Sequence, residues 1–131
     1  QTHTTRPSLF TEVDETTSFQ LEFPSGALAN LQTSFGFGMN YLRTTTGRGY
    51  IHLEPFQAYR NVRGESSQGP IAPAGVNQQA TQMDEDAYNI AQGNPVRVPG
   101  EEGWRDMRVV DAIRQSIREG GRRITLAPLE G

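Results

Sequence analysis

The sequence predicts an α+β fold with a mostly antiparallel, open-faced sheet, two helices packed on one face of that sheet, and the other face available for dimerisation. Three observations predict it: residues 15–23 alternate between apolar and polar side chains, short turns follow one another through the first half, and two later segments have helical spacing. With 131 residues and an apolar fraction of 34%, we expect a single domain, 1–131, with a modest core.

Short strands fill the first half of the chain. The alternating strand at 15–23 meets a turn at Pro24–Gly26, with proline and glycine where a type I turn favours them, and the pattern resumes over 27–35 as a hairpin. A polar alternating segment at 1–5 is a further strand, and the chain, starting at Gln1 within it, is expected to be a fragment or processed product. More strands are expected at 42–46, 50–53 and 57–62, followed by a Gly-, Pro- and Ser-rich loop over 63–78.

Two helices are expected in the second half. Residues 79–91 place apolar side chains on one side and end at Gly93-Asn94-Pro95. A longer helix opens at Pro99-Gly100 and stops at Gly120-Gly121, with acidic residues in its first turn and arginines near its end, as the helix dipole favours. A short return strand is predicted at 122–126.

One face of the predicted hairpin is polar and almost free of charge. The two readings are a solvated sheet face and a wet subunit interface, since interface cores are depleted in charge. The residues of this face are Thr16, Ser18, Gln20, Asn30, Gln32 and Ser34.

Composition excludes several kinds of chemistry and partner. The net charge of −3 gives no electrostatic reason to expect nucleic acid or an anionic membrane. No apolar run is long enough to cross a membrane, and nothing resembles a signal peptide. All 12 basic residues are arginine, so no lysine is present for acid–base or Schiff-base chemistry, and without cysteine there is neither disulfide nor thiolate metal site.

For most of the remaining candidate residues, the sequence favours a structural role over a catalytic one. His3 and His52 lack a second ligand at metal-binding spacing, so no metal site is predicted, and His52 is assigned to the surface or an interface ahead of catalysis. Asp106 falls on the inward side of the last helix, where either a structural partner or a substrate contact is expected. Gly36-Phe37-Gly38 lacks both the third glycine and the strand–loop–helix setting of a dinucleotide fingerprint, so residues 36–40 are expected to form a flexible exit from the hairpin.

The segment of the last helix carries the clearest motif of the chain: Pro99–Gly103, then Asp106, the apolar helix and Arg122–Leu126. This motif resembles the C-terminal signature of the glucose-fructose oxidoreductase, inositol dehydrogenase and rhizopine-catabolism (Gfo/Idh/MocA) superfamily, with the closest likeness to the glucose-fructose oxidoreductase branch. The hairpin of residues 12–35 and the segment of residues 44–55 are similar too, although Thr46 stands where glycine is common. In the segment Gln82-Met83-Asp84, Glu85 replaces the usual histidine.

The resemblance implies a C-terminal substrate and dimerisation domain of an NAD(P)-dependent sugar or polyol oxidoreductase of bacterial sugar metabolism. In such enzymes a Rossmann domain binds NAD or NADP and carries a Glu-Lys-Pro motif; neither is present here, so no catalytic or cofactor-binding residue is assigned and the isolated chain is expected to be inactive. The expected partners are a second copy, meeting through the open sheet face, and the Rossmann domain of the parent chain. Relatives occur in cytoplasm and periplasm, so the compartment stays open.

Part of a substrate-pocket wall is predicted at the hairpin exit and at the mouth of the first helix, where amides and aromatic faces suit a hydroxyl-rich ligand. Its residues are Phe35, Asn77, Gln78, Gln79 and Met83. The alternatives are an ordinary surface loop for these residues and, for the chain, a non-catalytic interaction or carbohydrate-binding module derived from the same domain.

Overall fold

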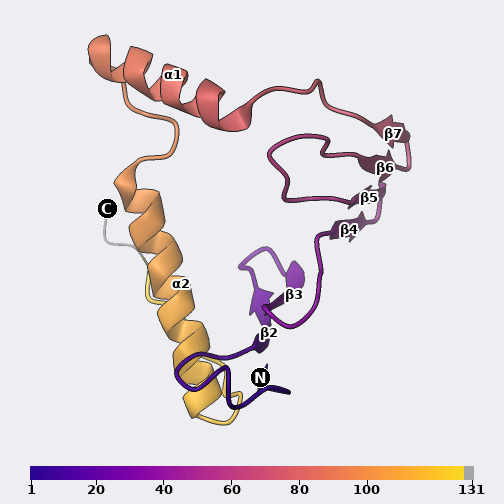
Figure 1. Cartoon of the computed structure of the whole chain (residues 1–131), viewed down its shortest axis with the longest axis vertical. Coiled ribbons are helices and arrows are strands. Elements are labelled where there is room, and N and C mark those ends of the chain that lie inside the picture. Colours follow the sequence, from indigo (N-terminus) through magenta and orange to yellow (C-terminus); the bar gives the residue numbers. More distant parts are fainter. Residues whose placement is uncertain (129–131) are drawn as a thin grey trace. The chain divides into compact units, whose positions relative to one another are not determined.

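The computed structural model describes residues 1–128 (Figure 1). The described chain divides into two compact units: residues 1–39 with the segment from residue 100 onward form unit 1, and residues 40–99 form unit 2. Both hold antiparallel strands and one helix, which confirms the α+β class. The strands form two sheets, one in each unit.

The sheet of unit 1 has three strands in the order β1 (Thr2–His3), β2 (Thr16–Glu22) and β3 (Leu28–Ser34). The predicted hairpin is confirmed: the Gly26 amide donates to the Phe23 carbonyl at 2.8 Å and Gly26 adopts φ 84°, a conformation that glycine allows without steric cost. Along β2 and β3, Phe19 lies opposite Leu31 and Leu21 opposite Ala29. The apolar and polar residues therefore separate onto opposite faces.

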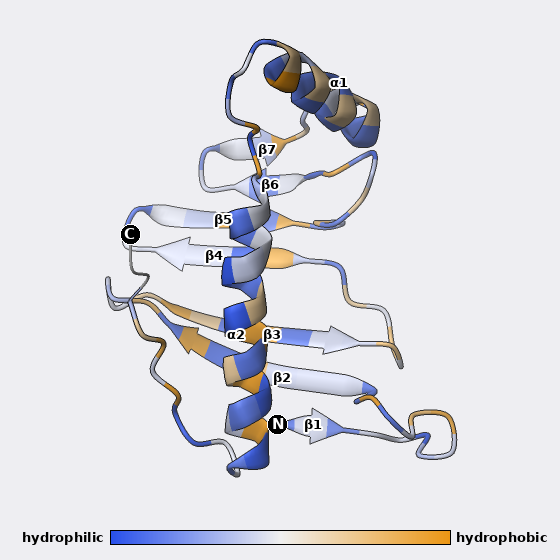
Figure 2. Ribbon diagram, turned by 90° about the vertical axis from the view of Figure 1, so that its left-hand side faces the viewer, coloured by the Kyte–Doolittle hydropathy of each residue, from blue (hydrophilic) through white to orange (hydrophobic). Residues whose placement is uncertain are grey.

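Helix α2 (Gly100–Arg118) completes unit 1, close to the predicted bounds. Figure 2 shows hydrophilic and hydrophobic stretches alternating along it. Its half-buried Val109, Ile113 and Ile117 line an apolar groove of about 900 Å³ together with Phe19 and Leu21 of β2. No hydrophobic side chain of residues 1–128 is fully buried, so helix and sheet enclose this groove without filling it.

The strand predicted at 122–126 is wrong. Gly120 and Gly121 take left-handed conformations, φ 72° and 92°, and the chain then turns back without entering a ladder. Side chains hold this segment instead: Arg123 pairs with Glu22 at 3.2 Å, and Arg108 donates to the Ala127 carbonyl at 2.7 Å.

Unit 2 contains a four-stranded antiparallel sheet in sequence order. Its strands are β4 (Leu42–Thr46), β5 (Gly49–Leu53), β6 (Gly64–Ser66) and β7 (Gly69–Ile71). The strand predicted at 42–46 is confirmed, and the one predicted at 50–53 begins one residue earlier. The next two strands lie where the sequence predicts a loop.

The strand predicted at 57–62 is wrong, because its backbone hydrogen-bonds to a side chain in place of a neighbouring strand. The Asn40 side chain accepts from the amides of Phe56 and Gln57 and donates to the Gln57 carbonyl at 2.6 Å, and Asn61 has φ 62°. These residues form a tethered loop. A left-handed residue interrupts an extended strand, and asparagine tolerates that conformation better than most side chains.

The hairpin of β6 and β7 has no sequence signal because strands of three residues show no period. Its turn is fixed locally: the Ser66 hydroxyl accepts from the Gln68 amide and donates to the Gly69 carbonyl, both at 3.1 Å. Gly64 meets β5 so closely that an added Cβ would lie 1.8 Å from the His52 carbonyl oxygen. Glycine is therefore required at the start of β6.

Helix α1 (Gln78–Ala91) confirms the predicted helix with one added residue at its start. The Asn77 side chain caps it by accepting from the Ala80 amide at 3.2 Å, and Gly93, with φ 69°, follows its end. None of its residues is buried; Met83, Tyr88 and Ile90 are all exposed. Among the described residues, neither helix is long and apolar enough to span a membrane.

Candidate functional site

The polar face of the first hairpin has the predicted pairing. Thr16 lies opposite Ser34, Ser18 opposite Gln32 and Gln20 opposite Asn30. Two of these pairs are joined by side chains, Thr16 to Ser34 at 2.7 Å between hydroxyls and Gln20 to Asn30 at 2.8 Å. Gln20, Asn30 and Gln32 are exposed, so their amides can bond to water or to another molecule. Their role in a subunit interface stays a prediction.

Phe35, a predicted pocket residue, lies at the end of this hairpin beside an aromatic partner. Its ring stacks on that of Phe10 with centroids 6.1 Å apart, and it is 76% exposed. The guanidinium of Arg6 lies 5.2 Å from the Phe10 ring centroid and reaches the Phe35 carbonyl at 3.4 Å. An exposed aromatic face next to a cation suits the apolar side of a sugar ring or another planar ligand.

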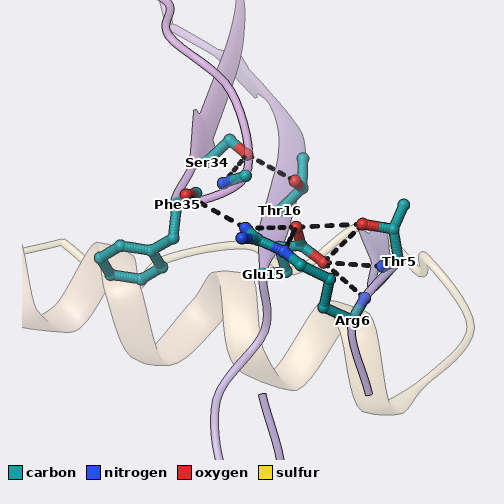
Figure 3. A network of polar contacts seen from close by, with 7 residues as sticks. Thr5, Arg6, Glu15, Thr16, Ser34 and Phe35 are labelled. Carbon is teal, nitrogen blue, oxygen red and sulfur yellow. Dashed lines mark hydrogen bonds and ion pairs between the residues drawn. The ribbon is translucent and has the colours of Figure 1, made fainter. Parts of the chain in front are cut away.

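A buried carboxylate holds this corner of unit 1 together (Figure 3). Glu15 is only 3% exposed and accepts from the Thr5 amide at 2.7 Å, the Arg6 amide at 3.1 Å and the Arg6 guanidinium at 2.9 and 3.0 Å. Its own backbone carbonyl accepts from the Phe35 amide at 2.9 Å. One residue thus connects the N-terminal segment to the hairpin that carries Phe35.

Electrostatics favour the charged form of this carboxylate. Burial alone would raise the pKa of Glu15, but the Thr5 amide, the Arg6 guanidinium and amide, and the Thr5 hydroxyl together outweigh it and lower the pKa to about 2. Glu15 is therefore ionised at neutral pH, and its bonds to Arg6 are charge-assisted. Because hydrogen bonds stabilise its charged form, the Glu15 carboxylate is a poor proton acceptor, and its role is structural.

Sequence reasoning missed this network because Glu15 sits in a run of acidic residues that looks like solvated surface. Gly36, the glycine after Phe35, is the sequence feature from which this network could have been predicted. A Cβ added at Gly36 would lie 2.3 Å from Glu15 Oε1, and the Gly36 amide donates to the Ser34 hydroxyl at 2.9 Å. Glycine is therefore needed at position 36 because the Glu15 carboxylate packs directly against it. The sequence pattern predicts only a flexible exit from the hairpin here.

In unit 2 the predicted pocket residues lie at the start of α1. Asn77 serves as its N-cap, and the Gln78 side-chain amide donates to the Ala58 carbonyl at 3.0 Å. Gln79 and Met83 are exposed. The structure thus brings Gln78 against the loop of residues 55–63, while Phe35 belongs to the other unit.

Tyr59 is a candidate site residue that the sequence did not reveal. It lies on the 55–63 loop, which Gln78 and Asn40 hold at Ala58, Phe56 and Gln57, and it remains 69% exposed. A loop tethered at several points that presents a tyrosine to solvent has the arrangement of a preorganised binding surface. The strand-like pattern of residues 57–62 concealed the loop.

The remaining candidates are partly or fully exposed. His52 contacts Glu54 at 3.3 Å and stacks on Tyr41, His3 is exposed, and no cluster of three metal-binding side chains occurs within residues 1–128. Asp106 is exposed, contrary to the expectation of an inward position. The reason is that the groove is lined by α2 only from Val109 onward, so the first turns of the helix face solvent.

Comparison with known proteins finds solved structures that resemble this chain, among them one that covers most of it. The chain is similar to the aldose-aldose oxidoreductase from Caulobacter crescentus, solved in complex with glycerol, with a TM-score of 0.85 and 32% identity. The match covers 95% of this chain but 39% of that enzyme. No family model matches the sequence. The chain is thus related to part of an oxidoreductase and spans well under half of its length.

Proposed function

We propose that this chain is the C-terminal domain of an NAD(P)-dependent sugar or polyol oxidoreductase of the Gfo/Idh/MocA family, and that it is inactive alone. The observation that carries the proposal is the match to the aldose-aldose oxidoreductase over 95% of the chain. The family motifs at residues 12–35 and 99–126 also support it.

In this proposal the domain contributes part of a substrate-pocket wall. The loop of residues 55–63 in unit 2, which the Gln78 side-chain amide holds at the Ala58 carbonyl, presents the exposed ring of Tyr59. Aromatic faces bind the C–H side of a sugar ring, and amides and guanidinium groups hydrogen-bond its hydroxyls. Oxidation at a carbon bearing a hydroxyl then requires a hydride acceptor, which a nicotinamide bound to another domain would supply.

The polar face of β2 and β3 is assigned to a homo-oligomer contact. Its exposed amides carry no net charge, and interface cores are depleted in charged residues. Such a contact would be wet, with amide pairs such as Gln20 and Asn30 bonding directly or through water to a second copy.

The test is to express the complete reading frame that contains this sequence and to analyse the purified protein for bound nucleotide after denaturation. The proposal predicts release of NAD(P) or its reduced form, and reduction of added NAD(P) by an aldose or polyol. A protein that binds sugars but neither carries nor reduces a nicotinamide would instead be the alternative, a carbohydrate-binding module derived from this domain. A protein that neither binds sugars nor carries or reduces a nicotinamide would contradict both the oxidoreductase proposal and the carbohydrate-binding alternative.

A further inference from the structure

The loop of residues 55–63 is held at its base and along its first half. At the base, the Glu54 amide donates to the Arg63 carbonyl at 2.8 Å, so the two ends of the loop lie side by side. Further along, the side chains of Asn40 and Gln78 hydrogen-bond to the loop backbone. Because it is tethered at several points, this loop offers its exposed side chains to a ligand from a defined position.

The second half of the loop carries positive charge only. It reads Tyr-Arg-Asn-Val-Arg from Tyr59 onward, and both Arg60 and Arg63 are exposed. Neither arginine forms an ion pair within residues 1–128. Their Cα atoms are at most ~11 Å apart, which allows two long side chains to contact one small ligand. On a chain with a net charge of −3, this is a local excess of positive charge.

The carboxylates that flank the loop in sequence are engaged elsewhere. Glu54 contacts His52 at 3.3 Å, and Glu65 accepts a hydrogen bond from the Tyr50 hydroxyl at 3.5 Å. The two guanidinium groups are therefore open to an anion from outside the described chain. A guanidinium group is planar and donates two parallel hydrogen bonds to a carboxylate or a phosphate, which makes arginine selective for these groups.

We infer that the substrate of the proposed oxidoreductase is a sugar that carries an acid group, either a carboxylate or a phosphate ester. Arg60 and Arg63 bind the acid group, and the ring of Tyr59 packs against the sugar ring. Tyr59 is 69% exposed and adjacent in sequence to Arg60, so the loop offers an apolar face and a cation together. This inference rests on the proposed function and adds the class of substrate to it.

The charges give the expected order of substrates. A neutral sugar gains the contact with the aromatic ring but forms no ion pair, whereas an acidic sugar of the same ring gains both. The difference is electrostatic, so it should be largest at low ionic strength and decrease as salt is added.

The experiment measures steady-state oxidation by the complete protein of three sugars with the same ring: glucose, glucuronate and glucose 6-phosphate. At low salt, kcat/KM for one of the two acidic sugars should exceed that for glucose at least ~10-fold, mainly through a lower KM. The advantage should shrink at ~1 M salt, where the Debye length is ~3 Å. The acidic sugar that shows the advantage identifies the acid group as a carboxylate or a phosphate.

Arg60→Gln and Arg63→Gln should each lower the ratio of kcat/KM for the preferred acidic sugar to that for glucose by ~10-fold or more. Because both rates come from the same preparation, partial unfolding of a variant cancels in this ratio. Arg48→Gln is the matched control: Arg48 is an exposed arginine of the turn between β4 and β5 and forms no ion pair within residues 1–128. This variant should keep the wild-type ratio.

Failure of the inference and failure of the proposed function give different results. Turnover of glucose with no preference for either acidic sugar, or a preference that survives both substitutions, would overturn the inference and leave the oxidoreductase proposal standing. No turnover of any of the three sugars would contradict the proposed function, and calorimetric titration with glucuronate and glucose 6-phosphate would then decide the inference. Saturable binding that Arg60→Gln weakens would support it, and no binding of either acidic sugar would overturn it.

Discussion

At the scale of single residues, Glu15 illustrates how burial and hydrogen bonding decide what a carboxylate does. Its neighbours in sequence, Glu12 and Asp14, are exposed, whereas Glu15 faces the Thr5 and Arg6 amides and the Arg6 guanidinium. Three sources of positive potential converge on one charge, and the cost of burial is outweighed. Its contribution to stability should therefore depend on pH in a defined interval.

Glu15→Gln should make unit 1 less stable at neutral pH and less sensitive to acid. The pKa of Glu15 is about 2 in the folded state and ~4.3 in an unfolded chain, so the stabilisation is complete above ~4.3 and is lost as the pH falls through about 2. Urea unfolding at pH ~5 and ~2.5 should show a larger loss for wild type than for the variant. Glu12→Gln, in the same segment, is the control and should follow wild type; equal acid sensitivity of Glu15→Gln and wild type would contradict this role.

Gly36→Ala should destabilise unit 1 by ~1–3 kcal/mol, the range for overpacking a well-fitted position. The new methyl group would lie 2.3 Å from Glu15 Oε1, and this carboxylate cannot yield without losing its bonds to Thr5 and Arg6. Thermal unfolding monitored by circular dichroism measures the effect. Gly38→Ala in the same loop has open space around it and should change stability by less than ~0.5 kcal/mol.

At the scale of elements, the long regular segments were predictable and the short ones were not. Both helices, the hairpin of residues 15–35 and the strands at 42–46 and 50–53 carry their own periods and turn residues. The segments at 57–62 and 122–126 have the sequence pattern of strands. In the structure, however, the Asn40 side chain hydrogen-bonds to the backbone at the start of the first segment, and arginine side chains fix the second. Tertiary hydrogen bonds of this kind leave no local pattern.

Asn77→Ala tests whether the Asn77 side chain caps the N-terminus of α1. Loss of the bond to the Ala80 amide should destabilise the helix by ~1 kcal/mol and speed hydrogen exchange at the amides of its first turn. Gln79→Ala, an exposed position in the same turn, should leave exchange nearly unchanged. Unaltered exchange in Asn77→Ala would show that the cap contributes nothing.

At the scale of the whole molecule, the candidate site was only partly readable from sequence. The facing pairs of the polar hairpin follow from the two-residue period of strands, and Gln78 is the first residue of α1, one residue before the predicted start of that helix. Tyr59 and Glu15 were missed because their importance depends on which segments meet: the tether of Gln78 to Ala58 and the contacts of Glu15 to Thr5 join residues 20 and 10 positions apart. Sequence periods describe neighbours along an element and say little about such contacts.

The central claim, that this chain lines the substrate pocket of a sugar oxidoreductase, is tested most directly by steady-state kinetics of the complete protein. Oxidation of aldoses and polyols should be measured for wild type, Tyr59→Ala and Tyr88→Ala, two exposed tyrosines of unit 2 at 69% and 64%. We predict NAD(P)-dependent turnover in which Tyr59→Ala loses ~10-fold or more in kcat/KM, about 1.4 kcal/mol of transition-state stabilisation, while Tyr88→Ala matches wild type. Turnover that is equally unaffected by both substitutions would remove Tyr59 from the pocket, and no turnover of any aldose or polyol would contradict the claim itself.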